Sequence, residues 1–147
     1  MFTVAARYGL GIAFFLIAYF ILAKLLGLHQ YPVFSAFNGV IFGVGIFVAM
    51  RKFKRNSDNF KYEHGFQAGF FTGAIATFIF SAFMAVYIFM LDTQFAQAIL
   101  DSWNLNYNKG SLMLVISLII MGLSTTLVLT LAFMQLLKES WNTSRLV

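Results

Sequence analysis

The chain has 147 residues, of which 61% are hydrophobic and 10% are charged, with a formal net charge of +5. Soluble domains carry about a quarter charged residues, so this composition excludes a soluble protein and indicates a membrane protein. The chain contains no cysteine, which excludes disulfides, thiol nucleophiles and thiolate metal sites.

Four apolar segments follow one another along the chain, and each is long enough to cross a bilayer as a helix. They cover about residues 8–28, 32–50, 65–91 and 112–137. The first is longer than the apolar part of a secretory signal peptide, so we interpret it as a retained helix. Pro32 opens the second, which suits the first position of a helix. The sequence predicts an all-α, single-domain membrane protein over residues 1–147, with four transmembrane helices in an antiparallel bundle.

Basic residues are concentrated between the second and third segments. Half of the ten lie in the predicted loop 51–64, namely Arg51, Lys52, Lys54, Arg55 and Lys61. Loops rich in Lys and Arg stay in the cytoplasm, so we expect this loop and both termini there, with only Lys24 and Lys109 outside. The loop then acts as a topology determinant, and contact with anionic headgroups or an acidic partner is the alternative. The segment is too short to indicate nucleic-acid binding.

A second polar segment lies between the third and fourth spans. Its apolar residues recur every four positions, at Leu91, Phe95, Ile99 and Trp103. This spacing predicts a short amphipathic helix at about residues 93–103, lying on the outer membrane surface. We expect it to cover the bundle, and a docking surface or a lid over an outward-facing groove is the alternative.

The sequence offers no constellation of catalytic or metal-binding side chains. His29 and His64 fall at opposite faces of the predicted membrane, and the five acidic residues are divided between the two sides. Glu63 and His64 are adjacent, but two ligands make a poor metal site. We therefore expect no enzyme, no metal and no cofactor. None of the four spans has a charge at its middle, which argues against ion-coupled transport.

One charged residue lies within a span. Lys24 is about four residues from the outer end of the first segment, where lysine side chains usually extend to the lipid headgroups. The alternative is that Lys24, Asn38 and Asp92 form a polar pocket in the outer leaflet for a lipid phosphate.

Small residues recur every four positions along the third span, at Gly65, Gly69, Gly73, Thr77, Ser81 and Ala85. Residues four apart share one face of a helix, and small residues let two helices approach closely in a bilayer. Strips with the same spacing occur in the first span at Ala5, Gly9 and Ala13, and in the second at Ser35, Gly39 and Gly43. We expect packing within the bundle. Homodimerisation or docking of another membrane protein through the third span is the alternative.

The segments FNGVIFGVGIFVAMRKFK and KYEHGFQAGFFTGAIATFIFSAFMAVYIFMLD, within residues 37–92, resemble an uncharacterised family of small bacterial inner-membrane proteins. Its members have four spans, a basic loop after the second, a glycine-led third span and a short outer helix. The resemblance covers nearly the whole chain and implies no catalytic residues. It implies a multi-pass protein of the bacterial inner membrane, surrounded by membrane lipids.

Together these observations lead us to expect a non-catalytic structural or accessory subunit that packs with itself or with a membrane partner. The alternative is a small lipid- or solute-handling protein with an outward-facing groove.

Overall fold

The computed structural model describes residues 2–27, 32–58, 61–91, 94, 97, 101 and 107–137. Within these residues it contains long helices and no strand. The elements are α1 (Phe2–Leu25), α2 (Pro32–Arg55), α3 (Tyr62–Val86), the π-helical turn η2 (Tyr87–Leu91) and α5 (Tyr107–Leu137). Each of the four long helices is long and apolar enough to cross a membrane. The predicted all-α, multi-pass membrane architecture is therefore confirmed.

The helices extend beyond the apolar segments that predicted them. α1 begins at Phe2, α5 begins at Tyr107, and α2 continues through Arg55, where the sequence predicted a loop from residue 51. Apolar composition marks only the part of a helix that lies in lipid, whereas backbone hydrogen bonding continues into the headgroup region. Lys and Arg also favour the last turn, because their charges oppose the negative end of the helix dipole.

The end of α1 has a clear local cause. Gly27 has φ +70°, a left-handed conformation that glycine adopts without strain. Its N–H donates to the Lys24 carbonyl at 3.0 Å, and the Leu26 N–H donates to the Leu22 carbonyl at 3.1 Å. These bonds satisfy carbonyl groups that the helix end would otherwise leave unpaired.

The outer amphipathic helix predicted at about 93–103 lies mostly outside the described residues. Gln94, Gln97 and Asp101 are described, and each is helical and exposed. These are residues of the polar face that the spacing predicts.

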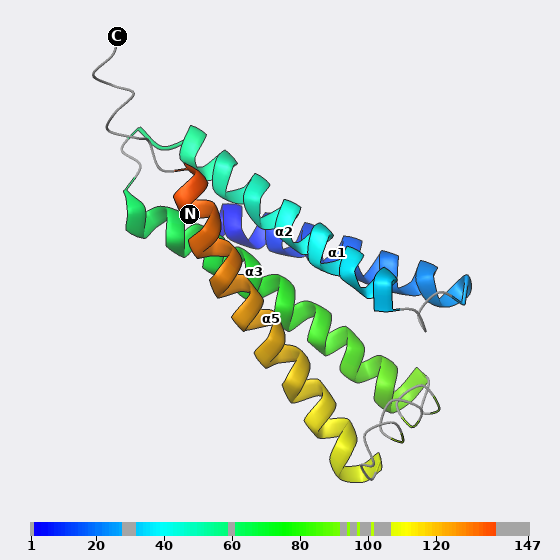
Figure 1. Cartoon of the computed structure of the whole chain (residues 1–147). Helices are drawn as coiled ribbons and strands as arrows, with labels where there is room; N and C mark the ends of the chain where they lie inside the picture. The colour runs from blue at the N-terminus through cyan, green and yellow to red at the C-terminus, as the bar shows by residue number, and fades with distance from the viewer. Residues whose placement is uncertain are drawn as a thin grey trace.

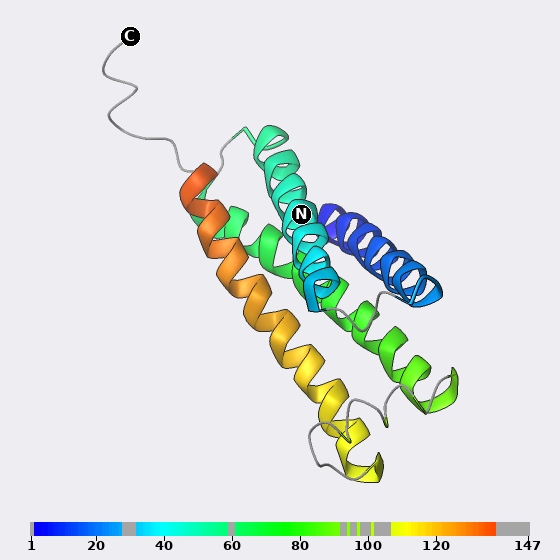
Figure 2. The same cartoon turned by 45° about the vertical axis from the view of Figure 1, so that its right-hand side comes forward.

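The helix α3 lies at the centre of the bundle and contacts α1, α2 and α5. In Figure 1, the start of α1 and the end of α5 lie at the same end of the bundle, together with the end of α2 and the start of α3. Figure 2 shows α1 and α5 on opposite sides of α3. Successive long helices therefore run in opposite directions, as the antiparallel prediction requires.

Two groups of buried side chains hold the helices together. The larger joins all four long helices through Ile12, Leu16, Phe42, Ile46, Met50, Ala76 and Met134. The smaller lies near η2 and contains Met84, Ile88 and Leu114. Because lipid is as apolar as these side chains, close packing rather than removal from water stabilises such contacts in a bilayer.

Candidate functional site

The small-residue strip of α3 lies against α2 and α5. A Cβ atom placed on Gly69 would lie 2.7 Å from Met50 Sδ and 2.8 Å from Thr130 Cγ2. A Cβ atom on Gly73 would overlap the side chain of Thr126. Such distances are far below van der Waals contact, so only glycine allows α3 to approach this closely.

The partner strip on α5 was missed by the sequence analysis. A Cβ atom on Gly122 of α5 would overlap Thr77 of α3, so each helix presents glycine where the other presents threonine. Thr126 also donates to its own helix, with Oγ1 2.7 Å from the Gly122 carbonyl oxygen. The signal was present, since Gly122, Thr126 and Thr130 also stand four residues apart.

The remaining predicted packing residues differ in their surroundings. Gly65 and Ser81 are buried, whereas Ala85 is half-buried. Gly43 of α2 has room for a side-chain atom beside α5. A Cβ atom on it would lie 3.8 Å from Leu129 Cδ1, which is an ordinary van der Waals distance. Gly39 does not pack within the bundle: this residue is exposed, and a Cβ atom there would have no atom within 4 Å. The reason is that α2 and α5 lie close together at their ends and diverge towards their starts (Figure 1), and Gly39 is nearer than Gly43 to the start of α2.

The small residues of α1 meet α3 along a separate line of contact. A Cβ atom on Gly9 would lie 2.8 Å from Ile75 Cγ2 and 2.9 Å from the Thr72 carbonyl oxygen. Thus α3 uses one set of contacts for α1 and another for α5.

The residues of the predicted outer-leaflet site have different neighbours. Lys24 Nζ lies 4.4 Å from the centre of the Tyr87 ring, a distance typical of a cation–π contact. Asn38 follows Phe37, whose ring lies 6.4 Å from that of Tyr19 on α1. Its buried Oδ1 atom has no hydrogen-bond partner within the described part of the chain. Asp92 lies outside that part.

The five basic residues of the predicted loop 51–64 also differ in their surroundings. Lys54 is half-buried, and its Nζ donates to the Leu137 carbonyl oxygen at 2.7 Å. The other four are exposed. Lys54 therefore joins the end of α2 to the end of α5.

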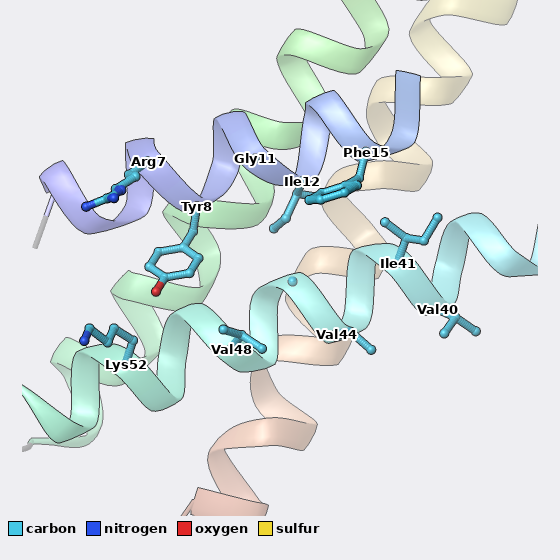
Figure 3. A pocket seen from close by; sticks show the side chains of 11 residues that line it. Arg7, Tyr8, Gly11, Ile12, Phe15, Val40, Ile41, Val44, Val48 and Lys52 are labelled. Carbon is cyan, nitrogen blue, oxygen red and sulfur yellow. The ribbon is translucent and has the colours of Figure 1, made fainter. Parts of the chain in front are cut away.

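A groove of about 780 Å³ runs between α1 and α2. This volume is within the range of about 300–1,000 Å³ that small-molecule sites occupy. Figure 3 shows its side chains. It is lined by Arg7, Tyr8, Gly11, Ile12, Phe15, Val40, Ile41, Val44, Gly45, Val48 and Lys52.

The middle of the groove is apolar, with a closely packed base and open sides. Ile12 is 4% exposed, and a Cβ atom on Gly45 would overlap it, so α1 and α2 nearly touch there. Phe15 is 63% exposed and Val44 57% exposed. A Cβ atom on Gly11 would meet no atom within 4 Å. The groove therefore has unfilled space beside an apolar surface.

One end of the groove is basic. Arg7 of α1 and Lys52 of α2 lie at this end on opposite sides of the groove, and the Tyr8 side chain extends from α1 towards α2 between them (Figure 3). Among the lining residues that the structure describes, none is acidic. This is the end of the bundle at which α1 begins and α5 ends (Figure 1).

The length of the groove is close to the thickness of one leaflet. Val40 and Lys52 bound it on α2, and at 1.5 Å per residue they lie about 18 Å apart. Half of the hydrocarbon core is about 15 Å thick. An occupant that fills the groove would therefore have about the length of one leaflet.

The comparisons with known proteins give one result. The model of a family described as "Protein of unknown function (DUF4199)" matches residues 7–139. The chain belongs to the DUF4199 family. The expected membership of an uncharacterised family is therefore confirmed. No curated protein and no solved structure matches the chain.

All the groove residues of this DUF4199 protein lie within the matched segment. Sequence reasoning placed its alternative groove under the outer helix, whereas the structure places one between α1 and α2. The described residues include no group of three His, Cys, Asp or Glu side chains arranged for a metal. The groove of this DUF4199 protein is apolar in its middle and has two cationic side chains at one end. Such a groove can bind an amphiphile.

Proposed function

We propose that the protein is a non-catalytic, multi-pass membrane protein that holds a membrane lipid in the groove between α1 and α2. The observation that carries this proposal is the groove itself, which is about 780 Å³ in volume and largely apolar. In a bilayer an unfilled apolar groove is occupied by lipid chains, because an empty space forfeits van der Waals contacts.

The contacts of α3 support lipid binding over partner docking through the third span. Gly69 and Gly73 already face α5 within the same chain. Homodimerisation or another helix would have to displace α5 from this face. We infer that the accessory role, if the protein has one, uses another surface.

We propose that the protein lies in the bacterial inner membrane with both termini in the cytoplasm. The support is the excess of Lys and Arg around residues 51–61, since such segments resist translocation. The basic end of the groove then lies in the cytoplasmic leaflet.

The experiment is to purify the protein in mild detergent and to quantify retained lipid by native mass spectrometry. Gly11→Leu introduces a side chain into the groove at a position with open space, so it should fill the groove without disturbing the fold. We expect this variant to lose most of the bound lipid. Gly39→Leu is the matched control, because Gly39 also faces open space but does not line the groove.

Equal lipid retention in the wild-type protein and the Gly11→Leu variant would contradict the proposal. Purification of the wild-type protein without lipid, but with a stoichiometric protein partner, would favour an accessory subunit instead.

A further inference from the structure

We propose that the groove selects a lipid with an anionic phosphate headgroup, which binds between Arg7 and Lys52 while one acyl chain lies along the groove. This inference rests on the proposed function and adds the chemical class of the ligand and its orientation. Four features carry it: the depth of the two cations, the donors they present, the absence of acidic lining residues and the length of the groove.

The two cations lie at nearly the same depth. The contact between Ile12 and Gly45 fixes the register of the antiparallel helices α1 and α2. From this contact, Arg7 is about 7.5 Å and Lys52 about 10.5 Å along the helix axis, in the same direction. Both side chains lie at one end of the groove in Figure 3. A headgroup at this depth would therefore have a cation on each side of the groove, Arg7 on α1 and Lys52 on α2 (Figure 3).

The donors suit a phosphate. A guanidinium group presents paired N–H donors that match two phosphate oxygens, and an ammonium group adds a compact positive charge. The Tyr8 hydroxyl, at the same end of the groove, can donate a further hydrogen bond. Since the described lining residues include no carboxylate, these cations are not neutralised within the groove.

The apolar walls suit an acyl chain that enters from the basic end. Val48, Val44 and Val40 follow one another along α2 at four-residue spacing and are all exposed. On α1, Phe15 forms the opposite wall at the deeper end. A chain lying against these residues would run from the phosphate towards the middle of the bilayer, which is the orientation of a lipid in that leaflet.

The length of the groove argues against a transmembrane partner helix as the occupant. Such a helix crosses both leaflets, over about 30 Å. The groove ends near Val40, after about 18 Å. A partner helix would also have to place acidic groups beside Arg7 and Lys52 in the headgroup region, where anionic lipids are already present.

The test measures headgroup preference in nanodiscs of equal parts phosphatidylglycerol and phosphatidylcholine, by native mass spectrometry of the released protein. We expect the wild-type protein to retain phosphatidylglycerol in preference, by about fivefold for each cation in contact. In the double variant Arg7→Gln, Lys52→Gln, the preference should fall to nearly one while the total bound lipid persists, because the apolar groove is unchanged.

The control is the double variant Arg51→Gln, Arg55→Gln. It removes the same charge from exposed positions at the same end of α2, outside the groove lining. We expect it to keep the preference for phosphatidylglycerol. Thermal unfolding in detergent checks that both double variants remain folded. The single variant Arg7→Lys, which keeps the charge, should retain part of the preference.

The outcomes separate the two proposals. An unchanged preference in the Arg7, Lys52 double variant, or an equal loss in the control, overturns the headgroup site. Bound lipid without any headgroup preference in the wild-type protein overturns only this inference. The absence of bound lipid, or a second protein chain in its place, overturns the proposed function as well.

Discussion

Gly73 of α3 leaves no room for a side chain, because any Cβ atom there would overlap Thr126 of α5. Gly69 is closed on two sides, by Met50 of α2 and Thr130 of α5. Side chains this deeply packed cannot move aside without disturbing their own helices. The close approach of α5 to α3 therefore requires glycine at both positions, because any larger residue would add a Cβ atom there.

We predict that Gly73→Leu destabilises the folded protein by about 3 kcal/mol or more, at the upper end of the cost of overpacking a core. The measurement is thermal unfolding in detergent. Gly39→Leu makes the same change at an exposed glycine with open space around it, and it should leave the unfolding temperature nearly unchanged. Similar unfolding temperatures for the Gly73→Leu and Gly39→Leu variants would contradict the close approach of α3 and α5.

The sequence revealed which residues of α3 form a strip, but not what the strip contacts. Spacing along one helix follows from 3.6 residues per turn, so it can be read directly. The partner depends on which helix lies beside it. For the same reason the sequence did not show that Gly39 has no contact within the bundle, whereas Gly43, about one turn away, lies against α5.

The Lys54 side chain links the end of α2 to the end of α5. The Lys54 ammonium group donates to the Leu137 carbonyl, which belongs to the last residue of α5. Carbonyl groups in the last turn of a helix lack partners within the helix and carry its partial negative charge. Lys54 therefore serves a structural purpose in addition to its contribution to the positive charge of this region.

We predict that Lys54→Met loosens the last turn of α5 and lowers the free energy of unfolding by about 1.5 kcal/mol, because one charge-assisted hydrogen bond is removed. Hydrogen–deuterium exchange in detergent should become faster for peptides that cover the end of α5 and stay unchanged in the middle of α3. Lys61→Met removes an exposed lysine from the neighbouring connection and should affect neither. Unaltered exchange at the end of α5 in Lys54→Met would show that the contact contributes no stability.

The existence and order of the elements could be predicted because apolar segments of sufficient length are decisive for membrane helices. The ends of the helices could not be predicted in this way. For example, α2 continues through Arg55, beyond the apolar segment that ends at residue 50. The groove could not be predicted from the sequence either. Its lining residues Arg7 and Lys52 are far apart in sequence, and only the antiparallel packing of α1 and α2 brings them to the same end of the groove.

At the scale of the whole molecule, the charge is distributed unevenly between the two ends of the bundle. Six of the eight described basic residues belong to the start of α1, the end of α2 and the residue before α3, which gather at one end (Figure 1), namely Arg7, Arg51, Lys52, Lys54, Arg55 and Lys61. Lys24, at the end of α1, and Lys109, at the start of α5, belong to the other end. Such an asymmetry sets the orientation of a membrane protein.

We predict that this end faces the cytoplasm. The chain contains no cysteine, so Asn56→Cys and Gln94→Cys each carry one thiol, at positions that are exposed. A membrane-impermeant maleimide should label Gln94→Cys in right-side-out vesicles and Asn56→Cys only in inverted vesicles. The reverse pattern would contradict the orientation, and labelling of both from one side would contradict the membrane crossing of α3.

The central position of α3 also sets an order of assembly during synthesis. α1, α2 and α3 contact one another, and all three leave the ribosome before α5 does, since chains form their structure from the N-terminus during translation. The face around Gly69 and Gly73 therefore lacks its α5 partner until residues 122–130 are synthesised. We expect the bundle to be complete only after α5, the last of the long helices, has packed against this face.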